Sequence, residues 1–106
     1  MADPQGDTIG AVKERAETKP RTQEPTQYAV VLINDDYTPM DFVVNILEDV
    51  FQKSPADAYR VMLQVHVNGR GVAGIYAWEV AETKAERVAA LAAEAGHPLK
   101  ATIEEA

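Results

Sequence analysis

The chain has 106 residues, of which 46% are apolar and 25% charged, a composition typical of one small globular domain with a single core. The absence of cysteine excludes disulfides, thiol catalysis and thiolate metal sites and is compatible with a reducing cytoplasm. A formal net charge of −7 argues against nucleic acid or an anionic membrane as the main partner, and favours a cationic ligand or a basic partner surface. With no secretory signal and no stretch of ~18 apolar residues, we expect a cytoplasmic protein that does not enter a membrane.

The N-terminal part of the chain differs in composition from the rest. Residues 1–27 contain no aromatic side chain and few large apolar ones, whereas Pro, Gln, Thr, Glu and Lys recur. Such a segment buries too little apolar surface to offset the entropy lost on ordering. We therefore predict a disordered tail over residues 1–27 and one folded domain over residues 28–106.

The folded part begins with an apolar run followed by a helix start. Residues 28–33 form a continuous β-branched and aliphatic run, which predicts a strand buried on both faces or nearly so. Thr38 as a hydroxyl N-cap, Pro39 at the first helical position and Asp41 two residues later indicate where the first helix begins. Apolar residues then recur at helical spacing as far as Phe51, so the first helix is predicted over residues 39–51.

Four further elements follow. Ser54 and Pro55 repeat the helix-start pattern, and Gly69 ends the second helix, which must fold back on the first. Residues 71–78 are predicted to form a strand whose two glycines indicate a bulge or a close backbone approach. A third helix opens at Glu79 and stops before Gly96, and a last strand is expected over residues 99–103. The order β-α-α-β-α-β favours an α+β fold of two layers, with the helices on one face of the sheet and the strand order left open.

The junction between the first strand and the first helix is the candidate site. Residues 34–40, Asn-Asp-Asp-Tyr-Thr-Pro-Met, place an amide and two adjacent carboxylates beside a buried strand. Burying such groups is costly unless they meet a partner. On the second helix, His66 shares a face with Met62.

Three separated motifs resemble those of one known family. They are residues 31–40 (Val-Leu-Ile-Asn-Asp-Asp-Tyr-Thr-Pro-Met), residues 62–66 (Met-Leu-Gln-Val-His) and residues 78–84 (Trp-Glu-Val-Ala-Glu-Thr-Lys). In order and spacing they resemble ClpS, the bacterial adaptor of the Clp ATP-dependent protease. The resemblance implies a three-stranded antiparallel sheet with three helices, similar to the C-terminal domain of the ribosomal stalk protein.

The same resemblance implies a function and its partners. Such adaptors recognise substrates whose N-terminal residue is Leu, Phe, Tyr or Trp and deliver them to the ClpA unfoldase for degradation by ClpP. We therefore expect a monomer that is not an enzyme, needs no cofactor or metal, and binds such substrates and the N-terminal domain of ClpA.

Site residues are implied position by position. The α-amino group would be held by acceptors, for which an amide oxygen, carboxylates and a neutral imidazole nitrogen are suited; the matching residues are Asn34, Asp36 and His66, with Asp35 alongside. The positions that match those around the bound side chain are Leu32, Thr38, Met40, Val43, Met62, Val65 and Leu99. Met40 matches a position that acts as a gate against β-branched residues, and Glu79 and Lys84 match positions that contact the unfoldase.

Taken singly, each of these residues has an ordinary structural interpretation. The adjacent aspartates could close a solvated turn, His66 could be a half-buried helix residue, and Met62 and Val65 could be plain core. Two rival functions also remain: a metal or acid–base site built from Asp35, Asp36 and His66, and a general protein-interaction module that ignores free N-termini.

Overall fold

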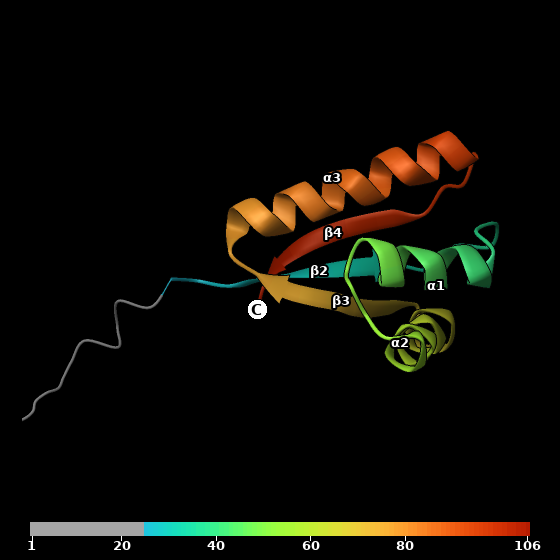
Figure 1. The fold of residues 1–106 in the computed structure, drawn as a ribbon, viewed down its shortest axis with the longest axis horizontal. Coiled ribbons are helices and arrows are strands. Elements are labelled where there is room, and N and C mark those ends of the chain that lie inside the picture. Colours follow the sequence, from blue (N-terminus) through green and yellow to red (C-terminus); the bar gives the residue numbers. More distant parts are fainter. Residues whose placement is uncertain (1–24) are drawn as a thin grey trace, which may run out of the picture.

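The computed structural model describes residues 25–106, and the expected tail lies outside this range except for its last three residues. Three strands form one antiparallel sheet in the order β3-β2-β4: β2 (Tyr28–Ile33), β3 (Arg70–Tyr76) and β4 (Lys100–Glu105). The helices are α1 (Met40–Asp49), α2 (Pro55–Asn68) and α3 (Trp78–Ala95). This α+β arrangement confirms the predicted fold class, and it supplies the strand order that the sequence left open (Figure 1).

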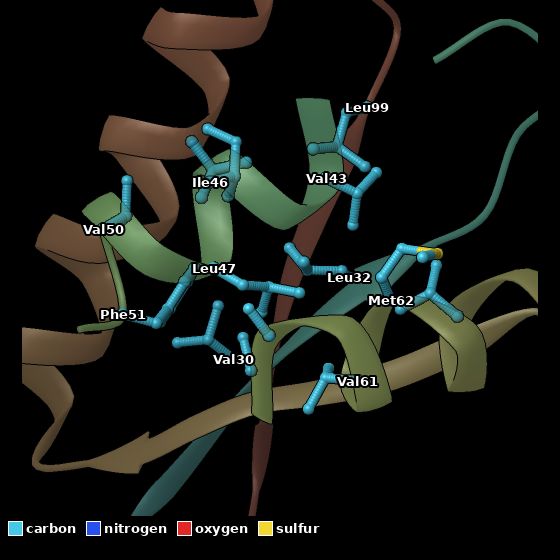
Figure 2. Packing of buried hydrophobic residues seen from close by; sticks show 14 of the residues in the cluster. Val30, Leu32, Val43, Ile46, Leu47, Val50, Phe51, Val61, Met62 and Leu99 are labelled. Carbon is cyan, nitrogen blue, oxygen red and sulfur yellow. The ribbon is translucent and has the colours of Figure 1, made fainter. Parts of the chain in front are cut away.

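All three helices cover one face of the sheet. Val30 and Leu32 of the central strand β2 point into the core, together with buried residues of α1, α2 and α3 (Figure 2). Alternate residues of β2 face the other side. On that side the flanking strand β3 exposes Val72 and Ile75. The predicted two-layer organisation is therefore correct.

Val31 is nevertheless fully buried although it points away from the helices. Arg70 lies opposite Ile33 on one flank of β2, and Glu104 lies opposite Ala29 on the other flank. Because these two side chains form an ion pair, they must cross over the central strand. This ion pair and the flanking strands explain why β2 is buried on both faces with helices on only one.

The boundaries of α1 differ from the prediction at both ends, and the helix stops at Asp49, before the predicted end at Phe51. Pro39 is the N-cap, with an extended backbone, and α1 begins at Met40 without a side-chain cap. The hydroxyl of Thr38 donates to Oδ2 of Asp35 instead of capping the helix. The predicted hydroxyl cap at Thr38 is therefore wrong, because the preceding loop uses that hydroxyl.

The start of α2 and both glycine stops agree with the prediction. The Ser54 hydroxyl accepts a hydrogen bond from the backbone of Asp57, and Pro55 is the first residue of α2. Gly69 and Gly96 cap α2 and α3 in the left-handed region, with φ of 87° and 78°. Glycine is the residue that adopts this conformation without a steric cost.

The glycine-containing strand shows both features expected of it. The register shifts between Val30 and Val31. Val30 pairs with Gly74 and Val31 pairs with Val72, so Ala73 is the extra residue of a bulge. At Gly71, an added Cβ would lie 2.8 Å from a methyl group of Val65, so α2 packs directly on the β3 backbone. The close approach places the end of α2 beside the end of β2.

The predicted end of this strand is wrong. Trp78 was expected to end it, but the strand stops at Tyr76 and Trp78 opens α3. The Trp78 ring packs edge-on against Tyr28 with 5.2 Å between ring centroids. An aromatic residue in the first turn of a helix can thus pack against the sheet as a strand residue would. Local propensity does not distinguish the last residue of a strand from the first residue of a helix here.

Candidate functional site

A hollow of about 360 Å³ lies where the end of β2, the start of α1 and the end of α2 meet. Its walls come from the loop after β2 and from one side of each helix. We call it the junction hollow; it is lined by Asn34, Asp35, Asp36, Tyr37, Thr38, Pro39, Met40, Val43, Met62, Val65 and His66. The two candidate motifs, residues 34–40 and the end of α2, are therefore parts of one site.

A backbone hydrogen bond joins the two halves of this site. The amide of Asn34 donates to the carbonyl oxygen of Gly69 at 2.9 Å. Gly69 caps α2 three residues after His66, and its left-handed conformation turns the chain back into β3. The cap thus holds the backbone of Asn34 beside the end of α2, although the two segments are far apart in sequence.

The loop after Asn34 is organised by the carboxylate of Asp35. Its Oδ1 accepts hydrogen bonds from the backbone amides of Tyr37 at 2.8 Å and Thr38 at 2.7 Å. Its Oδ2 accepts from the Thr38 hydroxyl at 2.8 Å. This is an Asx turn extended by a second, side-chain bond, and it holds the loop closed at the entrance to α1.

These contacts also set the acidity of Asp35. Partial burial acts to raise the pKa of its carboxyl group, because burial disfavours the charged form. The hydrogen bonds from Thr38 and Tyr37, with the nearby charge of His97, outweigh burial and hold the pKa below the ordinary value of 3.8. Asp35 is therefore a carboxylate at neutral pH.

The polar rim of the junction hollow is completed by Asn34, Asp36 and His66, and all three side chains are exposed. An amide oxygen, a carboxylate and a neutral imidazole nitrogen can all accept hydrogen bonds. Such a rim suits a cationic donor with several N–H groups. This agrees with the excess of negative charge on the chain.

The wall beneath the rim is apolar. Val43, Met62 and Val65 are buried core residues that reach the hollow, whereas Met40 is 47% exposed at its mouth. Methionine is unbranched and flexible, so it can adapt to guests of different shape. The arrangement can hold a cationic group at the rim and an apolar side chain below it.

Leu32 and Leu99 lie outside the residues that line the hollow. Both are buried in the core cluster, which also contains Val43 and Met62 (Figure 2). They support the apolar wall from behind. Conversely, Tyr37 and Pro39 line the hollow although neither was expected to. Their position inside the same seven-residue loop is the sequence signal that indicates a place in the lining.

The two expected unfoldase contacts have different surroundings. Glu79 is exposed in the first turn of α3. Lys84 is half-buried, and its ammonium group donates to the carbonyl oxygen of Val50 at 2.6 Å and to Oε1 of Gln52 at 3.0 Å. It also lies over the rings of Phe51 and Tyr76, at 5.8 and 5.3 Å. Lys84 thus has contacts within the fold whatever else it binds.

Within residues 25–106, no three or more His, Cys, Asp and Glu side chains come together as a metal site would require. Over the same residues, no helix combines the length and the apolar character needed to span a membrane.

Comparison with known proteins places the chain in a family. The family model described as "ATP-dependent Clp protease adaptor protein ClpS" matches residues 23–102. The ClpS adapter protein of Maricaulis maris is 55% identical over 87 residues, covering 82% of this chain and 80% of the relative. That of Phenylobacterium zucineum is 51% identical over 102 residues and covers 94% of each chain.

A solved structure shows the same fold. ClpS2 of Agrobacterium tumefaciens, bound to L-phenylalaninamide, is 42% identical and superposes with a TM-score of 0.75. The match covers 78% of this chain and all of that one. From the match to the family model and the identity to these relatives, we conclude that this chain belongs to the ClpS family of ATP-dependent Clp protease adaptor proteins.

Proposed function

We propose that this adaptor binds proteins by a bulky apolar N-terminal residue (Leu, Phe, Tyr or Trp) and its free α-amino group, and delivers them to the ClpA unfoldase for degradation by ClpP. As a member of an adaptor family, the chain is not an enzyme. The observation that carries the proposal is the junction hollow, whose rim of acceptors stands directly above an apolar wall. Its proposed site is the cytoplasm, where it would act as a monomer.

The chemistry of a protein N-terminus fits this arrangement. An α-ammonium group has three donors and is bonded to the carbon that carries the first side chain. Asn34, Asp36 and His66 offer acceptors at the rim, so the ammonium would meet them while the side chain enters the hollow. L-Phenylalaninamide, the ligand of the Agrobacterium relative, has the same two features, a free amine and an aromatic side chain.

The apolar wall favours a large apolar side chain. Burying a Leu or Phe side chain there contributes roughly 1.5–3 kcal/mol before the costs of ordering. Because that contribution is modest, the charged contacts at the rim must supply much of the affinity. Met40, at the mouth, would exclude β-branched residues and adapt to aliphatic and aromatic guests.

The first experiment separates the amine from the side chain. Calorimetric titration should show binding of a short peptide that begins with Phe, and none of the same peptide when its N-terminus is acetylated. A matched peptide beginning with Val should also bind poorly. Equal affinities for the free and acetylated peptides would exclude recognition of the α-amino group and would favour a general interaction module.

Delivery to the unfoldase would use α3, on a surface apart from the junction hollow. Glu79 is exposed there, so Glu79→Ala should weaken association with the N-terminal domain of ClpA and leave peptide affinity unchanged. Fluorescence anisotropy with the labelled adaptor would measure the association. If Glu79→Ala reduced both affinities together, the proposal of two separate surfaces would be wrong.

A further inference from the structure

A second hollow adjoins the junction hollow. It has a volume of about 340 Å³ and lies between the first half of α1 and the middle of α2. We call it the side hollow; it is lined by Met40, Asp41, Val44, Asn45, Tyr59 and Met62. Met40 and Met62 line both hollows, so the two cavities are neighbours that share these two side chains.

The lining of the side hollow is mainly apolar and partly open to solvent. Tyr59 is 56% exposed and Met40 is 47% exposed, whereas Met62 is buried. Asp41 and Asn45 provide the polar lining, and Oδ1 of Asp41 accepts a hydrogen bond from the backbone amide of Phe42 at 3.0 Å. Large apolar side chains that stay exposed together beside a cavity are typical of an interaction surface.

The polar rim of the junction hollow determines the direction in which a bound substrate continues. The α-amino group is the start of the substrate chain, and in the proposed function it is held by Asn34, Asp36 and His66. The rest of the substrate must therefore leave the junction hollow on the side away from this rim. Met40, which is exposed at the mouth and shared with the side hollow, lies on that path.

The geometry of an extended chain indicates which substrate residue meets the side hollow. Successive side chains of an extended chain point to opposite sides. When the first side chain enters the junction hollow, the second points away from the protein and the third points back to it, about 7 Å further along. A cavity that shares its lining with the first one is in the right place for this third side chain.

We propose that the side hollow is a subsite for the third residue of the substrate, that it prefers an apolar side chain such as Leu, and that Tyr59 determines this preference. The proposal rests on the proposed function and extends the recognised part of the substrate beyond its first residue. It gives a role to a cavity that binding of the first residue does not use.

The test uses two peptides of equal composition and charge. Phe-Ser-Leu-Ser and Phe-Leu-Ser-Ser, both amidated at the C-terminus, differ only in whether Leu is the third or the second residue. In calorimetric titration the first peptide should bind about fivefold more tightly, because only its Leu side chain is removed from water in the side hollow. Equal affinities, or a preference for the second peptide, would overturn the proposal.

Tyr59→Ser assigns the difference to the side hollow. Because Tyr59 is exposed, its substitution leaves the core intact. The variant should bind the two peptides within about twofold of each other, because the apolar contact with the third side chain is lost. Val67→Ser is the matched control, since Val67 is 74% exposed on the same helix and lines neither hollow. It should keep the full difference between the peptides.

L-Phenylalaninamide has no third residue, so its binding reports on the junction hollow alone. If Tyr59→Ser weakened its binding as strongly as that of Phe-Ser-Leu-Ser, Tyr59 would act on the first residue and the proposed subsite would be wrong. A difference between the peptides that persisted in Tyr59→Ser would also overturn the proposal. Failure of the unaltered protein to bind L-phenylalaninamide would overturn the proposed function and the subsite with it, whereas binding of L-phenylalaninamide with equal peptide affinities would overturn the subsite alone.

Discussion

The side chains around the junction hollow fall into two groups according to what they contact. The hydroxyl of Thr38 and the carboxylate of Asp35 are bonded to each other and form the loop. The imidazole of His66 and the carboxylate of Asp36 are exposed at the rim. Protonation of the Asp35 carboxylate should therefore change the stability of the fold, and substitutions at the rim should change ligand affinity.

Acid should reveal the contribution of Asp35 to stability. Its pKa is lowered in the folded state, so its hydrogen bonds stabilise the fold above the ordinary carboxyl pKa and this stabilisation is lost as pH falls through the folded-state pKa. Urea unfolding of the unaltered protein and of Asp35→Asn should therefore differ near neutral pH. The two free energies of unfolding should converge below about pH 4. A difference that stays constant down to about pH 2 would contradict this cause.

Removing the imidazole of His66 should weaken ligand binding. The imidazole is exposed at the rim of the junction hollow, where a ring nitrogen can accept a hydrogen bond from an ammonium group. In His66→Ala the affinity for L-phenylalaninamide, measured by calorimetric titration, should fall about tenfold.

The matched variant is His66→Gln, which keeps a hydrogen-bond acceptor at this position. Its affinity should fall less than that of His66→Ala. Equal affinities of His66→Ala and the unaltered protein would show that His66 does not contact the ligand.

At the scale of elements, the hollow depends on how closely α2 and α1 are held to their neighbours. Gly71 lets α2 approach the backbone of β3, and Cγ2 of Val65 lies 2.8 Å from the position that an added Cβ would take. At the other end, Lys84 of α3 binds the carbonyl oxygen of Val50, just after α1. One contact sets the position of the apolar wall, and the other sets the end of the helix that begins at Met40.

Gly71→Ala should move α2 outward. The new methyl group would lie 2.8 Å from Cγ2 of Val65 and 3.4 Å from the carbonyl oxygen of Val61, so side chain and backbone must both adjust. Overpacking of this kind costs about 1–3 kcal/mol in free energy of unfolding. Affinity for a Phe-initiated peptide should fall as well, because Val65 lines the hollow. Ala73→Gly, at the bulge residue two positions further along β3, is the control for backbone changes in this strand and should not alter the contact with Val65. Unchanged affinity in Gly71→Ala would show that the position of α2 does not shape the hollow.

Lys84→Met tests the contact between α3 and the end of α1. The variant keeps the aliphatic part of the side chain but loses the hydrogen bond to Val50 and the charge over the rings of Phe51 and Tyr76. We expect a loss of about 1–2 kcal/mol in free energy of unfolding, measured by urea titration. Arg87→Met, at an exposed position of α3, is the control and should change stability little. If Lys84→Met is as stable as the unaltered protein, the proposed contact with the unfoldase is the main role of Lys84.

At the scale of the whole molecule, one hydrophobic core connects the sheet with all three helices. The same buried cluster contains Val43 and Met62, which also form the wall of the hollow (Figure 2). A small domain with one core generally unfolds in a single cooperative step. The site and the core should therefore unfold together.

Leu47→Ala tests this coupling. Leu47 is fully buried, so the substitution should lower the free energy of unfolding by about 2–5 kcal/mol. Circular dichroism reports on the helices, and fluorescence reports on the single tryptophan, Trp78, which is partly exposed at the start of α3. The two transitions should shift by the same amount and coincide. Separate transitions would show that α3 unfolds independently of the core.

Much of the site was predictable because its residues are grouped in two short segments. The loop of residues 34–40 brings seven lining residues together by sequence proximity, and helical spacing places Met62, Val65 and His66 on one side of α2. That the two segments meet depends on the hydrogen bond between Asn34 and Gly69, which joins residues far apart in the chain. That the two segments form one site was predicted from the resemblance to a known family and not from the periodicity of the sequence.

The sequence by itself determined the strand at residues 28–33, the start of α2 at Ser54 and Pro55, and the glycine stops at Gly69 and Gly96. Each of these depends on interactions within a few residues. Only the tertiary structure decided the strand order, the helical state of Trp78, the inward direction of the Asp35 carboxylate and the attachment of Lys84 to the end of α1. Strand order and the contacts of Trp78 and Lys84 depend on groups distant in sequence. The two neighbouring aspartates have the same local propensity, and only the path of the folded loop makes one a support and leaves the other at the rim.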